Sequence, residues 1–127
     1  DLDGGDCTAA TPPTLALPTG STPTGIAVYR DDAIPSLSGS LLVVLSGSYN
    51  DLDLRGYFIA AVDPTSGSFA SIMPTRPDDT PASDFTIEQM SYRGSGFFPH
   101  RPLDIAVTEQ GWVYISMGGG RILALRP

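Results

Sequence analysis

The sequence contains no lysine, and it has only one histidine and one cysteine among its 127 residues. The single cysteine, Cys7, has no partner for a disulfide within the chain, so we expect it to be free or paired outside the chain. No set of cysteines and histidines has the spacing of a zinc site. One histidine also offers no Ser-His-Asp arrangement that the sequence alone identifies. The chain is therefore poor in the residues that zinc centres and nucleophilic enzymes use.

Positive charge is scarce as well. All seven basic residues are arginines, against 14 aspartates and glutamates, and the formal net charge is −7. A chain this acidic is repelled by phosphate groups, which argues against nucleic acid and anionic membrane surfaces as partners. No apolar run approaches the roughly 18–20 residues that a membrane-spanning helix needs, so we expect no membrane span.

The chain is rich in turn-forming residues, with 14 glycines and 12 prolines, and short apolar runs lie between them. The clearest pattern is in the last quarter, where apolar runs at 103–107, 112–116 and 121–125 are separated by short turns, the second of them Gly118–Gly120. Such runs predict an antiparallel meander. Both faces of these runs are largely apolar, so we expect each strand to be covered on both sides, as in the stacked blades of a β-propeller.

An earlier group of apolar runs predicts a four-stranded blade, with strands at 25–30, 40–45, 56–62 and 68–73. The last of these runs is the most polar, which places it at an outer edge of the sheet. Two further short strands are expected at Thr14–Leu17 and Asp84–Met90.

The predicted fold class is therefore all-β, with antiparallel blades that form about two blades of a larger propeller. The organisation is an acidic, proline-rich N-terminal segment (1–22) followed by a partial propeller (23–127), which comprises a blade (23–73), a long loop (74–102) and an incomplete blade (103–127). Propellers typically have 4–8 blades, so two do not close a ring. An open apolar edge invites aggregation. We expect the remaining blades to come from another polypeptide or from further copies of this chain.

Several stretches carry a family resemblance. They are Pro23–Tyr29 (Pro-Thr-Gly-Ile-Ala-Val-Tyr), Ser40–Val43, Ser46–Asn50, Gly56–Tyr57, Arg101–Val107, Gly111–Ser116 and Gly120–Leu123. In order and spacing, they resemble the C-terminal part of the soluble PQQ-dependent glucose/sorbosone dehydrogenase family. The resemblance covers roughly Pro23 to Arg126. It implies a secreted, six-bladed propeller that holds PQQ on its axis and a structural calcium, and that oxidises an aldose.

The resemblance also suggests cofactor-binding residues. Arg101 matches an arginine that points to the cofactor in the family, and His100 beside it is the one plausible catalytic-looking neighbour. An arginine fork suits the carboxylates of a quinone acid. The alternative for Arg101 is a salt bridge to Asp104 or to another blade. Three positions depart from the family pattern, because Ser46 replaces a histidine, Leu103 an arginine and Met117 an acidic residue. The catalytic histidine of the family lies in an earlier blade, so we assign no catalytic residue.

Asn50, Asp51 and Asp53 form a weaker candidate site in the loop after the second strand. Clustered oxygen ligands suit Ca²⁺, although a solvated turn explains the same residues.

Tyr29, Tyr57, Trp112 and Tyr114 are the aromatic candidates for a sugar or quinone platform. Packing between blades is the commoner role of such side chains.

The sequence therefore predicts the C-terminal portion of a secreted PQQ sugar dehydrogenase-like propeller, non-catalytic as an isolated chain and completed by another polypeptide. In the complete assembly, any activity would be PQQ-dependent oxidation of an aldose or sorbosone. The alternative is a structural or glycan- or protein-binding subunit that closes its ring by self-assembly.

Overall fold

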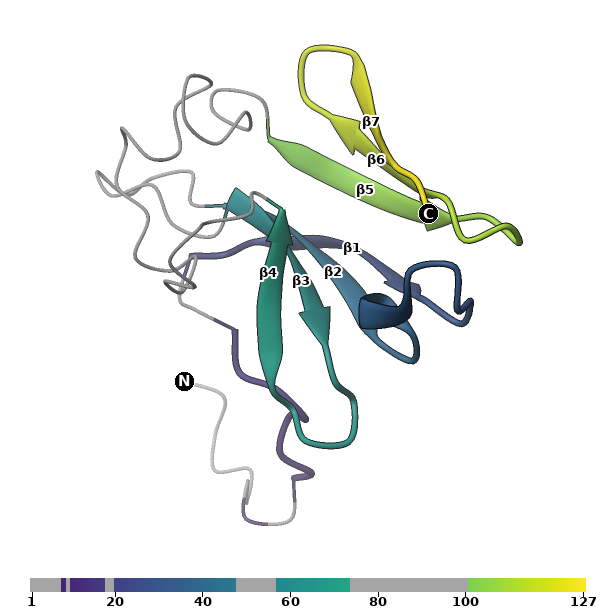
Figure 1. Ribbon diagram of the computed structural model, residues 1–127. Coiled ribbons are helices and arrows are strands. Elements are labelled where there is room, and N and C mark those ends of the chain that lie inside the picture. The colour runs from purple at the N-terminus through teal and green to yellow at the C-terminus, as the bar shows by residue number, and fades with distance from the viewer. Residues whose placement is uncertain (1–7, 9, 18–19, 48–56, 74–100) are drawn as a thin grey trace.

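The computed structural model describes residues 8, 10–17, 20–47, 57–73 and 101–127 (Figure 1). Within these ranges the chain forms seven β-strands in two antiparallel sheets, together with one short 3-10 helix, η2 (Pro35–Leu37), in the first hairpin loop. The described part contains no helix long and apolar enough to cross a membrane.

Sheet 1 has four strands in the order β1-β2-β3-β4. They are β1 (Pro23–Val28), β2 (Leu41–Ser46), β3 (Tyr57–Val62) and β4 (Phe69–Met73). Each lies within two residues of its predicted bounds, and β4 is at the edge of the sheet as predicted. The central strands are rich in β-branched and aromatic residues, which favour the extended backbone. Successive side chains point to opposite faces, so a strand that is apolar throughout has both faces to bury.

Sheet 2 has three strands in the order β5-β6-β7. They are β5 (Pro102–Val107), β6 (Val113–Met117) and β7 (Arg121–Leu125), which confirms the predicted meander. Residues 118–120 form the turn between β6 and β7, also as predicted. Gly119 and Gly120 have positive φ angles of 79° and 74°, a backbone region that other residues enter only at a cost.

One predicted strand is wrong. Thr14–Leu17 has no strand assignment, and its leucines, Leu15 and Leu17, instead pack on the outer face of sheet 1. The segment stabilises the fold by side-chain burial and not by a backbone ladder. Its apolar alternation is the same for both arrangements, so the sequence does not distinguish them. The strand predicted at Asp84–Met90 lies outside the described residues.

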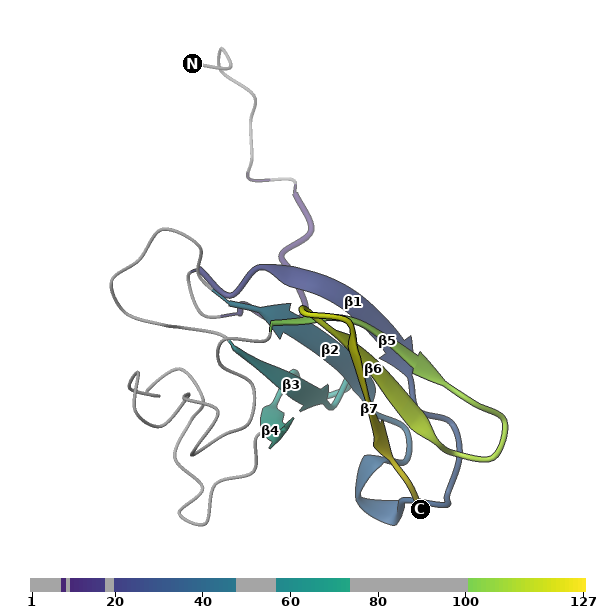
Figure 2. The same ribbon diagram turned by 90° about the horizontal axis from the view of Figure 1, so that it is seen from above.

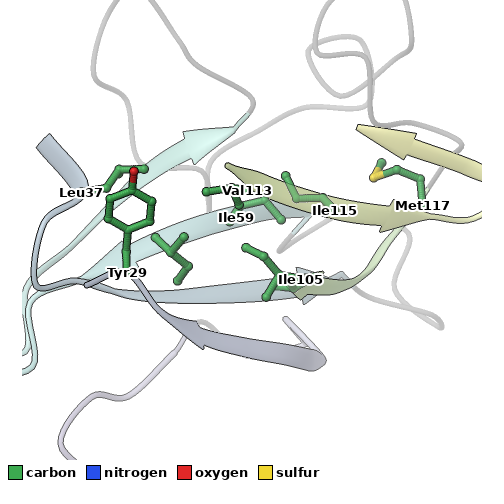
Figure 3. Packing of buried hydrophobic residues seen from close by; sticks show 9 residues of the cluster. Tyr29, Leu37, Ile59, Ile105, Val113, Ile115 and Met117 are labelled. Carbon is green, nitrogen blue, oxygen red and sulfur yellow. The ribbon is translucent and has the colours of Figure 1, made fainter. Parts of the chain in front are cut away.

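The two sheets pack face to face. Sheet 1 contributes Leu42, Val44 and Ile59 to the shared core, and sheet 2 contributes the side chains of Ile105, Val113, Ile115 and Met117 (Figure 3). Each fully buried aliphatic side chain contributes roughly 1.5–3 kcal/mol relative to an exposed one. This core therefore holds the two sheets together as one body.

Strands β1 and β5 lie side by side and run in the same direction (Figures 1 and 2). Their approach is close at Gly25, where an added Cβ would lie 2.7 Å from Asp104 Oδ1 and 3.0 Å from Asp104 Cα. From this line the two sheets extend outward strand by strand, which is how neighbouring blades of a propeller are arranged around an axis. The chain is all-β and forms part of a β-propeller, with one four-stranded and one three-stranded blade.

The outer faces of the two blades differ. Leu15 and Leu17 lie over the outer face of sheet 1, where Phe58 and Val62 are buried. The outer face of sheet 2 is open among the described residues, with Ile122 72% exposed. The described chain covers one face of the last three strands, so the expectation that both faces are covered stays a prediction for the other face.

Candidate functional site

Arg101 lies where the chain enters β5, and its half-buried side chain reaches across to sheet 1. The Nη1 group donates hydrogen bonds to the carbonyl oxygens of Ser46 at 2.8 Å and Gly47 at 3.2 Å. The guanidinium carbon lies 4.6 Å from the centre of the Tyr57 ring. A guanidinium over an aromatic face is a cation–π arrangement. Arg101 thus contacts the end of β2 and the start of β3 together.

Ser46 is the second polar residue of this junction and is fully buried. Its Oγ donates a hydrogen bond to the carbonyl oxygen of Pro102, and it lies 3.0 Å from Oγ1 of Thr24. A buried hydroxyl without partners would be costly, and these contacts satisfy it. Ser46 occupies the position where the resembled family has a histidine, and its small hydroxyl fits between β1, β2 and β5.

The geometry of Arg101 does not suit it to hold a quinone carboxylate through Nη1. A bidentate arginine–carboxylate pair uses two parallel N–H groups that point at the same anion. Here Nη1 points at two backbone carbonyls, and one face of the guanidinium lies on Tyr57. These contacts place Arg101 in a junction between the sheets. Its two predicted roles, to hold the cofactor or to form a salt bridge to Asp104 or another blade, stay predictions.

The other predicted site residues, His100, Asn50, Asp51 and Asp53, lie outside the described residues. Their proposed roles stay predictions. Over the ranges that the structure covers, no three His, Cys, Asp or Glu side chains gather closely enough to hold a metal ion.

Tyr29 and Tyr57 are packed side chains, with 0% and 1% of their surfaces exposed. The Tyr29 hydroxyl donates to the Gly111 carbonyl oxygen at 3.0 Å and accepts the Ile34 N–H at 3.1 Å. It thereby joins the β1–β2 loop to the β5–β6 turn. These two aromatics have the structural role that the sequence left open.

Trp112 and Tyr114 are arranged differently. Their rings stack with centroids 6.1 Å apart, and Tyr114 is 40% exposed on the outer face of sheet 2. The open ring surface is available to a partner.

Two hollows lie beside the inner strands. The larger, of about 610 Å³, lies on the outer face of sheet 1 between the leucines of the N-terminal segment and the side chains of Ile26 and Val43. It is mostly apolar, with Asp104 at its margin. Such a hollow suits apolar side chains better than a charged substrate.

The smaller hollow, of about 540 Å³, lies where β1 and β5 end, and Arg30, Asp31 and Glu109 line it. No motif in the sequence identifies these residues. Their position in the sequence could have indicated the hollow. Charged residues follow both β1 and β5, and the propeller arrangement places these two strands side by side.

The family model described as strictosidine synthase-like, N-terminal, matches residues 98–125. The match spans β5, β6 and β7 and leaves most of the chain unmatched. No curated protein matches the chain. No solved structure matches it either. This match points to a family related to β-propellers, in agreement with the two blades, and it does not single out the PQQ-dependent glucose dehydrogenases.

Proposed function

We propose that the chain is a two-blade portion of a secreted propeller similar to the PQQ sugar dehydrogenases, and that it is non-catalytic until further blades complete the ring. The observation that carries the proposal is the open apolar face of sheet 2. Ile122 is 72% exposed there, and Tyr114 is 40% exposed. The opposite face of the same sheet is buried against sheet 1.

The two blades supply an internal comparison for this face. On the outer face of sheet 1, the ring of Phe58 is fully buried, stacked 6.1 Å from Phe69 and adjacent to the N-terminal segment. Tyr114 corresponds to Phe58, because it also lies on a central strand with its side chain on the outer face of its sheet. Among the described residues, however, no segment covers Tyr114. Large apolar side chains exposed together on one sheet face favour a site of association. The partner that fits is another antiparallel blade, because blades pack through apolar sheet faces.

The strictosidine synthase-like match supports a propeller over the same three strands. The motifs from Pro23 to Arg126 favour the sugar dehydrogenases within that architecture. The secreted location rests on that resemblance.

PQQ would supply the oxidant for an aldose in the complete propeller, and calcium would be its structural ion. The described residues of this chain form no complete site for either group, since Arg101 is engaged by sheet 1 and no acidic cluster is present in the described ranges. In the proposal, therefore, residues of other blades contribute most of any such site. The chain's own contribution is to complete the ring.

The proposal is tested by native mass spectrometry of the chain as it is isolated from its source. We expect it to travel with a companion of several further blades. Ile122→Asp should release the companion by placing a charge in the apolar contact. Ser36→Asp adds the same charge at an exposed position of the β1–β2 loop and should leave the complex intact. A stable monomer with no companion at any concentration would overturn the proposal.

Activity separates an enzyme from a non-catalytic relative. The complete assembly would be supplied with PQQ and Ca²⁺, and aldose oxidation would be followed by reduction of a dye. Turnover in the assembly, with none in the separated chain, is the expected result. Absence of turnover in the assembly would contradict the proposed dehydrogenase function, and the proposed propeller assembly would still stand.

Self-assembly is the second candidate, and one observation favours it. The outer face of sheet 1 is also open along β1, where Ile26 is 65% exposed and Val28 is 44% exposed. A two-blade unit with apolar faces at both ends can associate head to tail into a closed ring. Native mass spectrometry would then show multiples of this chain alone, and Ile26→Asp would break them as effectively as Ile122→Asp.

A further inference from the structure

We propose that Arg101 is a clamp that fixes sheet 2 on sheet 1, and that it does not serve as a ligand for an acidic cofactor. The inference concerns contacts within the chain, so it stands whether or not the proposed function is correct. It also runs against the role that the family resemblance gives this residue.

The clamp rests on the carbonyl groups where β2 ends. Ser46 and Gly47 are buried, and their N–H groups donate to the carbonyls of Thr22 and Ser21 at 3.0 Å and 2.9 Å. Their own carbonyl oxygens accept the two hydrogen bonds from Arg101. Buried carbonyls need a donor, and a charged donor makes the stronger bond. Arg101 thus completes the hydrogen bonding of this end of sheet 1.

The backbone of Arg101 is held by sheet 2 at the same time. Its carbonyl oxygen accepts the N–H of Gly118 at 2.7 Å, in the turn between β6 and β7. The next residue, Pro102, accepts the hydrogen bond from Ser46 Oγ. One residue therefore bonds sheet 2 through its backbone and sheet 1 through its side chain. This connection joins positions 55 residues apart in the sequence.

Tyr57 closes the arrangement from the side. Its buried ring lies against the guanidinium, with 4.6 Å between the ring centroid and the guanidinium carbon. The ring restricts the rotation of the side chain, so the fork is held in place for the two carbonyls. An arginine that is already oriented loses less entropy on forming each bond. These contacts assign Arg101 to the junction.

The inference is tested with Arg101→Ala and Arg101→Lys, and with Arg126→Ala as the matched control at an exposed arginine. Thermal unfolding is followed by the fluorescence of Trp112. We expect Arg101→Ala to lower the Tm by at least about 4 °C, since it leaves two buried carbonyls without their donor. Arg101→Lys should lie between Arg101→Ala and the unmodified chain, because lysine keeps the charge and loses the fork. Arg126→Ala should not change the Tm.

A double-mutant cycle with Tyr57→Leu tests the contact itself. If the ring holds the guanidinium, the Tm losses of Tyr57→Leu and Arg101→Lys are not additive, and the double variant loses less than their sum. The cycle uses the milder arginine variant, so it remains informative if Arg101→Ala fails to fold. Additive losses, or an Arg101→Lys variant as stable as the Arg126→Ala control, would overturn the clamp.

A second readout addresses the cofactor. The complete assembly, carrying the unmodified chain or its Arg101→Lys or Arg126→Ala variant, is titrated with PQQ, and binding is followed by calorimetry. We expect the three titrations to agree within about twofold. A loss of tenfold or more for Arg101→Lys alone would overturn the inference, because it would place Arg101 on the cofactor.

Discussion

The two sheets have similar central strands and different surroundings. β3 reads Tyr-Phe-Ile-Ala-Ala-Val and is buried at every position but one, whereas β6 reads Val-Tyr-Ile-Ser-Met and alternates buried with partly or more fully exposed residues. Sheet 1 has sheet 2 on one face and the leucines of the N-terminal segment on the other. Sheet 2 is covered by sheet 1 on one face, and no described residues cover its other face. The comparison shows that an apolar pattern on both faces of a strand predicts two neighbours, and that this chain supplies the second neighbour for one sheet only.

The largest predicted effect is a difference in the unfolding free energy lost when Phe58 or Tyr114 is truncated. These two aromatic residues lie on the outer faces of β3 and β6. Phe58→Ala removes a fully buried ring and should cost about 3–5 kcal/mol. Tyr114→Ala removes a ring that is 40% exposed and should cost less than about 1 kcal/mol in the isolated chain. Urea unfolding followed by circular dichroism measures both.

In the assembled protein, the stability losses of Phe58→Ala and Tyr114→Ala should be more similar, because a further blade on sheet 2 would bury Tyr114. Phe58→Leu, a milder change, serves if Phe58→Ala does not fold. Equal losses for the two alanine variants in a verified monomer would mean that the two outer faces are covered alike.

The next effect concerns the line where the sheets meet. Gly25→Ala should destabilise the chain by about 1–3 kcal/mol, because the new methyl group would lie 2.7 Å from Asp104 Oδ1 and 3.2 Å from the Ile105 nitrogen. Gly118→Ala is the control, since its methyl group would meet its nearest atom, the Arg101 nitrogen, at an ordinary 3.4 Å. Guanidinium unfolding compares the two variants. If Gly25→Ala proves as stable as Gly118→Ala, β1 and β5 are not in close contact.

Tyr29→Phe tests the connection at the other end of the same strands. The change removes a hydroxyl that donates to Gly111 and accepts from Ile34, and it should cost roughly 1–3 kcal/mol. Tyr114→Phe removes a hydroxyl on the open face and should be nearly neutral. Thermal unfolding of the two variants side by side measures the difference. A neutral Tyr29→Phe would show that water satisfies both groups.

The smallest effect is expected in the β3–β4 turn of sheet 1, which is stabilised by a carboxylate. The corresponding β6–β7 turn of sheet 2 is formed by glycines instead. Asp63 accepts the Thr65 N–H at 2.7 Å and the Ser66 hydroxyl at 2.8 Å. The hydrogen bond from the Thr65 N–H is the main reason that the pKa of Asp63 lies below its usual 3.8, and the hydrogen bonds from Ser66 lower it further. A lowered folded-state pKa stabilises the fold above the unfolded pKa, and this contribution is lost as the pH falls through the folded pKa.

Asp63→Asn should therefore lower the Tm slightly at pH 7 and by less at pH 2, because the contribution of the native carboxylate is lost as the pH falls through its folded-state pKa. Thermal melts of both proteins at the two pH values check this. The exposed site makes the difference small. An identical difference at both pH values would show that the charge of Asp63 contributes nothing to the turn.

Much of the fold was predictable because its signals are local. Apolar runs and glycine or proline turns predicted all seven described strands within two residues, and the polar character of residues 68–73 placed β4 at an edge. Thr14–Leu17 failed because alternating leucines suit either a strand ladder or a strap that packs by its side chains. The candidate site was less predictable, since the sequence left Arg101 open between a cofactor and a salt bridge to Asp104 or another blade and did not indicate its bonds to two backbone carbonyls.

The sequence by itself determined where the strands lie and that both faces of each central strand are apolar, because strand propensity and side-chain alternation depend on neighbouring residues. Only the tertiary structure decided which of those faces are covered, and that Arg101 donates to Ser46 and Gly47. Those outcomes depend on segments that are distant in the sequence and meet only when the chain folds. A hydrogen bond between them has no counterpart in the local pattern of the chain.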